Sequence, residues 1–164
     1  MVVRLSLESP ELRAIAVQQL RTCARNGMPV AGYLWEYPTT PFSDVDQVIS
    51  LAHDAGAELM TLWLDAEQQG VGVAELRPEV DRCHELEIPS GIYTSEGYWF
   101  TIGNPDDFGD EPLWIAHYTG QPDLESAPSF GGWKKRAGHQ YRADAQIAGL
   151  TVDLNIFRSS ILFV

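Results

Sequence analysis

The residues best suited to chemistry are two carboxylates, Asp65 and Glu67, which follow the apolar run Thr61-Leu62-Trp63-Leu64. Residues two apart on a β-strand point to the same face, so Trp63, Asp65 and Glu67 are expected to share one side. A strand that is buried on both faces and carries acids only at its C-terminal end is typical of the catalytic rim of a parallel α/β barrel. A strand followed by a polar turn with two solvated acids is the alternative, and this pattern alone does not decide between them.

Other predicted strands carry aromatic and polar side chains at the same two-residue spacing. Rings of this kind stack on pyranose faces while paired acids act on a glycosidic oxygen, so their convergence at one barrel mouth predicts a sugar site. Taken singly, each Trp or Tyr is more typical of core packing, and only their convergence favours a binding role. The same-face sets are Tyr33 with Trp35, Trp114 with Tyr118, and Asp153 with Asn155.

Length and charge limit the classes of function. The 164 residues suit one domain, 1–164, with enough chain to bury a core. The net charge is −12 and no basic run occurs, so nucleic acid is not expected as a partner. No apolar run has the length of a membrane span, and residues 1–7 predict a strand and no signal peptide. Cys23 and Cys83 lack metal-ligand spacing and are expected to be buried thiols.

The order of the predicted elements indicates an α/β fold. The first half alternates strands and helices at a spacing typical of βαβ units, whereas the second half runs from strand to strand through loops. The helix within 70–87 is expected to begin near Pro78. The predicted helices are 10–26, 43–55, one within 70–87 and a short one at 95–100, and the predicted strands are 2–7, 29–35, 58–65, 88–94, 112–118, 139–141 and 151–157.

Six segments, in order and over nearly the whole chain, resemble glycoside hydrolase family 25, the N-acetylmuramidase lysozymes. The resemblance implies a modified TIM-like barrel of five βα units and three further strands, (β/α)5(β)3. It rests most on the Trp-Ile-Ala-x-Tyr and Val-Asp-Leu-Asn segments. The matching segments are Ala31-Gly32-Tyr33-Leu34-Trp35, Leu64-Asp65-Ala66-Glu67, Gly91-Ile92-Tyr93-Thr94-Ser95, Leu113-Trp114-Ile115-Ala116-His117-Tyr118, Gln140-Tyr141 and Val152-Asp153-Leu154-Asn155-Ile156-Phe157.

What the resemblance implies is hydrolysis of the β-1,4 bond between N-acetylmuramic acid and N-acetylglucosamine in peptidoglycan. Glu67 matches the general acid/base, and Asp65 and Asp153 match carboxylates that stabilise positive charge and hold the substrate. The spacing of Asp65 and Glu67 suits substrate assistance, in which the acetamido group attacks C1 and Asp65 orients it. The resemblance implies no cofactor. The residues expected to line the substrate cleft are Tyr33, Trp35, Tyr93, Trp114, Tyr118 and Asn155.

The chain departs from the family pattern at its ends. Residues 1–7 match the family's second strand, so the first strand, its helix and its Asp-x-Ser aspartate are not expected in this chain. A barrel that lacks a strand has two unpaired edges, which invite pairing. Another chain, or the apolar tail Ile161-Leu162-Phe163-Val164, could fill that gap, or the barrel could stay open. Leu34 stands where the family often has His.

Three other kinds of site or function fit parts of the sequence. His117 falls off the face that carries Trp114 and Tyr118, so a metal site using it with Asp65, Glu67 and Asp153 is not favoured and no metal is expected. No nucleophile elbow supports a Ser or Cys triad. The serious rival is a catalytically inactive, glycan-binding or structural domain of a larger, phage-type assembly. The hydrolase interpretation predicts synthesis in the cytoplasm and action at the bacterial cell wall, as an endolysin or virion component.

Overall fold

A computed structural model describes residues 1–5, 7, 9–38, 43–134 and 136–159. Strands and helices alternate as far as β5, and two further strands follow without a helix between them. The tail 161–164, which the sequence offers as one way to complete the barrel, lies outside the described residues. In chain order the elements are β1 (Val2–Arg4), α1 (Pro10–Arg25), β2 (Val30–Trp35), α2 (Ser43–Asp54), β3 (Leu59–Asp65), α3 (Val73–Glu85), β4 (Ser90–Ser95), α4 (Glu96–Thr101), β5 (Leu113–Ala116), β6 (Gly138–Ile147) and β7 (Leu150–Phe157).

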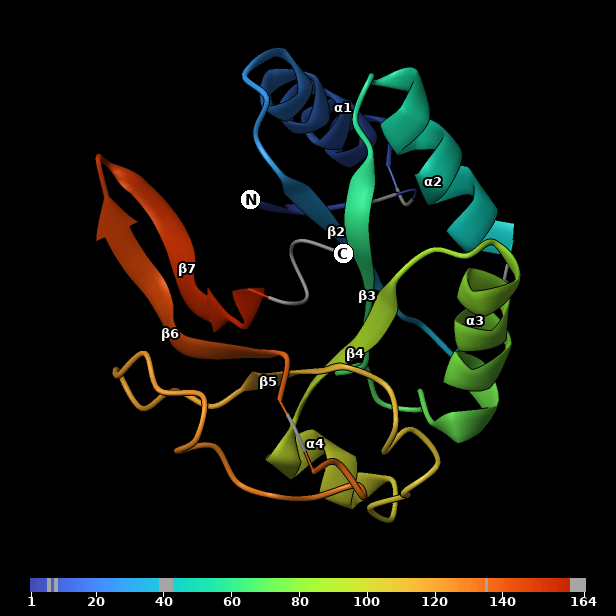
Figure 1. Ribbon diagram of the computed structural model, residues 1–164, viewed down its shortest axis with the longest axis vertical. Helices are drawn as coiled ribbons and strands as arrows, with labels where there is room; N and C mark the ends of the chain where they lie inside the picture. The colour runs from blue at the N-terminus through green and yellow to red at the C-terminus, as the bar shows by residue number, and fades with distance from the viewer. Residues whose placement is uncertain (6, 8, 39–42, 135, 160–164) are drawn as a thin grey trace.

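The strands form one mixed sheet in the order β1 to β7, parallel up to the antiparallel pair β6–β7. The sheet curls into a half-barrel, with α1, α2 and α3 on its outer side and the β6–β7 hairpin standing across from them (Figure 1). Four βα units followed by three strands are what remains of a (β/α)5(β)3 barrel without its first unit. The predicted α/β fold is therefore confirmed. Among the described residues, β1 and β7 are the outer strands of this sheet.

Two cores cover the two faces of the sheet. The outer core lies between the strands and helices and is mainly aliphatic, with both cysteines buried in it as predicted. The inner core is mainly aromatic: the ring centroids of Trp63 and Trp114 are 5.6 Å apart, and Phe157 packs on both rings. Gly91 leaves the room that the Trp63 ring occupies, since a Cβ there would lie 2.5 Å from it. This aromatic layer forms the floor beneath the strand ends.

Local signals set most helix boundaries. Ser9 and Ser95 each accept a hydrogen bond from a backbone N–H three residues on, at 3.2 Å, and so cap α1 and α4. The prediction that the third helix begins near Pro78 is wrong, because α3 begins at Val73. The Glu75 carboxylate accepts a hydrogen bond from the Gly72 N–H at 2.9 Å and fixes the earlier start.

The last strands also differ from the prediction. β5 ends at Ala116, so Tyr118 lies beyond the strand rather than within it. β6 extends to Ile147, well past the predicted 139–141, because it pairs with β7 through a hairpin. Ala148 and Gly149 at the tip both have positive φ, at 51° and 80°, as a tight two-residue turn requires.

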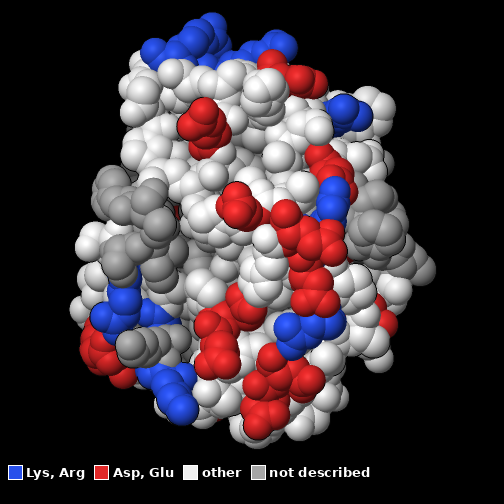
Figure 2. Space-filling model, turned by 45° about the vertical axis from the view of Figure 1, so that its right-hand side comes forward, with Lys and Arg blue, Asp and Glu red and all other residues white. Residues whose placement is uncertain are grey.

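The surface charge is spread over the molecule. Figure 2 shows acidic side chains scattered over the face that carries α2 and α3, with basic side chains among them and others gathered toward the end formed by α1. In the described part of the chain, no helix combines the length and hydrophobicity that crossing a membrane requires.

Candidate active site

The inner face of the half-barrel surrounds a cavity of about 950 Å³. It runs from the C-terminal ends of β2 and β3, where Trp35 and Asp65 lie, to the start of β2 at Val30, and residues of β1 and β7 also line it. The structure brings all nine predicted site residues into its wall, although they come from five strands and two loops. These nine are Tyr33, Trp35, Asp65, Glu67, Tyr93, Trp114, Tyr118, Asp153 and Asn155.

The two acids at the end of β3 are held on an extended segment. The Ala66 N–H donates to the Tyr93 carbonyl at 2.8 Å, and the Thr94 hydroxyl donates to the Ala66 carbonyl at 2.7 Å. These bonds to β4 continue the strand pattern past Asp65, so Asp65 and Glu67 both face the cavity while Ala66 is buried on the other side. The predicted same-face arrangement is confirmed.

Burial changes the protonation of both acids. Asp65 is 3% exposed, and burial, together with the Glu67 charge, raises its pKa to about 8, although the Arg4 guanidinium opposes the shift. Burial and the negative charge of Asp153 also raise the pKa of Glu67. Carboxyls whose pKa is raised in this way are suited to donating protons or hydrogen bonds. The buried Oδ1 of Asp65 has no hydrogen-bond partner among the described residues.

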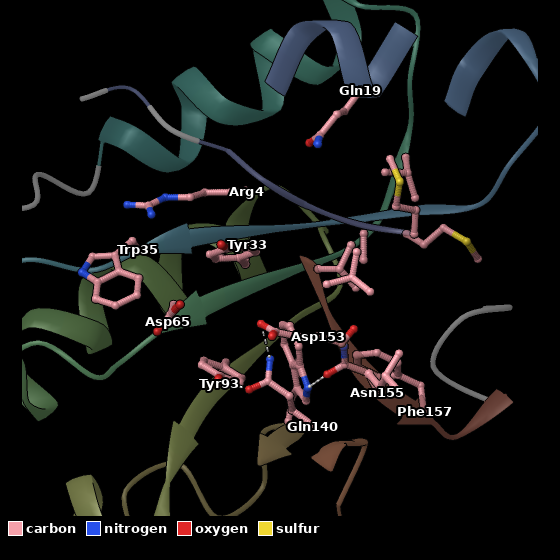
Figure 3. A pocket seen from close by; sticks show the side chains of 18 of the residues that line it. Arg4, Gln19, Tyr33, Trp35, Asp65, Tyr93, Gln140, Asp153, Asn155 and Phe157 are labelled. Atoms are coloured by element: carbon pink, nitrogen blue, oxygen red, sulfur yellow. Dashed lines mark hydrogen bonds between the residues drawn. The ribbon is translucent and has the colours of Figure 1, made fainter. Parts of the chain in front are cut away.

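The opposite wall is a hydrogen-bonded network centred on Gln140, which is 5% exposed (Figure 3). Its Oε1 accepts from the Tyr93 hydroxyl at 2.8 Å and from the Tyr118 hydroxyl at 2.9 Å. Its Nε2 donates to Oδ2 of Asp153 at 3.2 Å. One amide therefore connects two phenols of the cavity wall to the third predicted acid.

Further bonds fix Asp153 and its neighbour on β7. The Asp144 N–H donates to Oδ1 of Asp153 at 3.1 Å. Asn155 donates through Nδ2 to the Asp153 carbonyl at 3.2 Å and accepts at Oδ1 from the Trp114 indole N–H at 3.0 Å. Asp153 thus lies across the cavity from Asp65 (Figure 3), and Glu67 lines the same cavity.

Comparison with known proteins agrees with this geometry. The model of glycosyl hydrolases family 25 matches residues 13–150. The chain belongs to glycosyl hydrolase family 25. Two relatives from Dictyostelium discoideum are "Counting factor 50", 32% identical over 133 residues (75% of this chain, 43% of the relative), and "Probable GH family 25 lysozyme 3", 33% identical over 132 residues (74% of this chain, 27% of the relative). The chain therefore spans less than half the length of these curated relatives.

A solved structure supports the fold assignment. The Clostridium perfringens spore cortex lytic enzyme SleM superposes with a TM-score of 0.66 at 24% sequence identity. The match covers 88% of this chain and 54% of that protein. At this identity the likeness shows that the two share a fold, namely the half-barrel described above.

The aromatic residues of this family 25 domain differ in how much surface they offer to a ligand. Tyr118 is 61% exposed, and Tyr33 and Trp35 are half-buried in the cavity wall. Trp114 is 4% exposed and packs on Tyr93 with ring centroids 4.4 Å apart, so most of its surface belongs to the inner core. The three more accessible rings are those available for stacking.

Two cavity residues were not identified from the sequence. Arg4 Cζ lies 5.2 Å from the centroid of the Trp35 ring, and the guanidinium charge lowers the pKa of Asp65. In the sequence, the one indication of this role is that Arg4 is a lone charged residue in an otherwise apolar strand. Gln140 belongs to a matching segment, but its role depends on partners from three other parts of the chain. In the described residues, no cluster of three or more His, Cys, Asp or Glu side chains could hold a metal ion.

Proposed function

We propose that this domain is a lysozyme-type peptidoglycan hydrolase that cleaves the β-1,4 bond between N-acetylmuramic acid and N-acetylglucosamine. The observation that carries the proposal is the extended segment at the end of β3, which directs Asp65 and Glu67 into a cavity opposite Asp153. Family membership supports the proposal. Two similar proteins also support it by name, since one is called a probable GH family 25 lysozyme and the other a spore cortex lytic enzyme.

In this proposal Glu67 is the general acid. Its raised pKa keeps the carboxyl protonated at a pH where an exposed glutamate is ionised, so it can protonate the glycosidic oxygen as the bond to C1 breaks. The resulting carboxylate then takes a proton from the attacking water. The charge of Asp153 stabilises the positive charge that develops on the sugar.

Asp65 is assigned the substrate-assisting role. The acetamido oxygen of the cleaved sugar bonds to C1 as the glycosidic bond breaks, and the water activated by Glu67 then attacks C1 and displaces that oxygen, so no protein carboxylate forms a bond to the substrate. Oδ1 of Asp65 is buried without a partner among the described residues and can accept the acetamido N–H or, when protonated, donate to that group. A buried acceptor gains most when such a substrate group pairs with it.

Product analysis tests which bond is cleaved. Purified cell walls are digested, and the new reducing ends are reduced with borohydride and identified by mass spectrometry. The proposal predicts reduced N-acetylmuramic acid ends from the parent and from Glu58→Gln, a matched change at an exposed site just before β3. Glu67→Gln should release none. Reduced N-acetylglucosamine ends, or products from Glu67→Gln, would contradict the assignment.

A non-catalytic glycan-binding or structural domain is the second candidate. The half-barrel is open between β1 and β7 in the described residues, and one relative bears the name counting factor rather than lysozyme. Folded protein that is retained on cell walls without releasing reducing ends would favour this candidate, while release of N-acetylmuramic acid ends would exclude it.

We also propose that another chain completes the barrel along this opening. Met1 beside β1 is 49% exposed and Leu150 at the start of β7 is 66% exposed, so apolar surface is available at both edges. Light scattering after gel filtration tests the proposal, because a monomer in solution would contradict self-association.

The setting we propose is the bacterial cell wall, with a phage-type endolysin or virion component as the source. Lysis of intact cells by added protein tests that setting.

A further inference from the structure

We propose that Gln140 is a positioning residue of the active site, which holds both cavity phenols through one shared acceptor and holds Asp153 as an acceptor toward the substrate. The inference rests on the proposed hydrolase function. Gln140 is on β6, 5% exposed, and its side chain contacts residues from β4, β7 and the segment after β5. Among the described residues, no other side chain hydrogen-bonds to β4, to β7 and to the segment after β5.

The chemistry of the amide assigns a separate task to each of its two polar atoms. A glutamine oxygen only accepts and its nitrogen only donates, while a phenol can do both. Tyr93 and Tyr118 both reach Oε1, and their hydroxyls also hydrogen-bond to each other. The Gln140 oxygen is therefore an acceptor that the two phenols share, and it holds both hydroxyls at the cavity wall.

The same constraint acts on Asp153. Nε2 of Gln140 donates to Oδ2 and the Asp144 N–H donates to Oδ1, so each carboxylate oxygen receives a hydrogen bond. Both oxygens are therefore held in place by donors from β6. The Asp153 charge in turn acts on Glu67 across the cavity. Gln140 thus influences the proposed proton donor through Asp153 without contacting the reacting atoms.

Gln140→Glu tests the arrangement without removing the acceptor for the phenols. The change puts an acid against Asp153 in place of a donor and adds negative charge near Glu67. The turnover rate should fall roughly tenfold or more, as expected when a bond to a charged group is lost. The alkaline limb of the pH–rate profile should move to higher pH, because added negative charge makes Glu67 retain its proton longer.

Gln146→Glu is the matched control, since Gln146 lies on the same strand outside the cavity and bonds only to Thr151 at 2.9 Å in the described contacts. It should leave the rate and the alkaline limb unchanged. A structural role alone would lower the melting temperature of the uncharged variant Gln140→Leu but leave the turnover rate of its folded form unchanged. An unmoved limb in a folded Gln140→Glu variant overturns the proposal.

Saccharide binding separates this proposal from the hydrolase assignment. The fluorescence of the cavity tryptophans is titrated with a disaccharide of N-acetylglucosamine and N-acetylmuramic acid. Gln140→Leu should weaken binding at least tenfold, while Gln146→Leu should bind as the parent does. Weakened binding with no hydrolysis by the parent would support positioning and reject the hydrolase. Equal binding by both variants would overturn the positioning role even if the parent is an active enzyme.

Discussion

The carboxyl groups of Glu36 and Glu79 face each other in the outer core, each 1% exposed. Burial raises the pKa of both carboxyls, most strongly that of Glu36, where the neighbouring Glu79 carboxyl adds to the shift, so the pair retains a proton. Apart from each other, their carboxyl oxygens have no hydrogen-bond partner among the described residues. Because the Glu36 N–H also donates to the Asp65 carbonyl at 3.0 Å, this pair lies directly behind the proposed site.

The pair predicts a stability that falls as the pH rises. Between the ordinary glutamate range and the raised values, the folded state binds more protons than the unfolded chain, so its free energy of unfolding decreases with pH. Glu79→Gln removes one ionising group and should stabilise the protein by roughly 1–3 kcal/mol at pH 8. Its advantage in melting temperature should shrink toward pH 4. An advantage that does not change with pH would contradict a shared proton.

Asp65→Asn tests the protonation of the buried acid. The pKa of about 8 means that Asp65 is neutral below that pH, so the amide mimics its folded-state form. The free energy of unfolding of the parent should decrease as the pH rises from about 4 toward 8, and the variant should lack this decrease. Hydrolysis should fall roughly tenfold or more, because asparagine cannot change its charge during the reaction. Paired thermal melts and rate assays from pH 4 to 9 measure both effects.

Trp114→Phe tests the bond that joins β5 to β7. The variant keeps an aromatic ring in the inner core but loses the indole donor to Asn155. The free energy of unfolding should fall by about 1–2 kcal/mol, from the lost bond and the smaller ring. A double-mutant cycle with Asn155→Ala should give a coupling energy of about 0.5–1.5 kcal/mol in urea unfolding. Strict additivity would show that the bond contributes nothing to stability.

Gly91→Ala tests the packing of the aromatic floor. An added Cβ would lie 2.5 Å from the Trp63 ring and 2.6 Å from the Pro112 carbonyl oxygen, so backbone or ring must move. Overpacking of this kind costs about 1–3 kcal/mol. Gly97→Ala is the matched control, because Gly97 lies in α4 with nothing within 4 Å of its added Cβ. The control should be neutral or slightly stabilising in urea unfolding, and equal destabilisation by both changes would contradict this packing.

Local sequence signals predicted much of the fold. The apolar runs that end at Trp35 and Asp65 are recognisable without tertiary context. The start of α3 was missed because Pro78 looked like a first-turn residue, whereas the Gly72–Glu75 contact sets the boundary. The length of β6 was missed because its outer part is polar and depends on pairing with β7.

The site could be predicted only in part, because some of its contacts also depend on residues that are distant in the sequence. Asp65 and Glu67 follow from a strand period, and their relation needs no distant residue. Gln140 and Arg4 contact residues that are far from them in the sequence, so the residues next to them in the chain do not indicate their partners. The raised pKa values also depend on burial, which is a property of the assembled half-barrel.

The most direct test of the account is the rate of cell-wall hydrolysis by Glu67→Gln, measured as loss of turbidity beside the parent and Glu58→Gln. All three proteins should melt at similar temperatures, since Glu58 is exposed and Glu67 half-buried. The account predicts that Glu67→Gln loses roughly 10²–10⁴-fold in rate, the contribution of a general acid, while Glu58→Gln matches the parent. A folded Glu67→Gln variant that clears cell walls at the parent's rate would contradict the central claim.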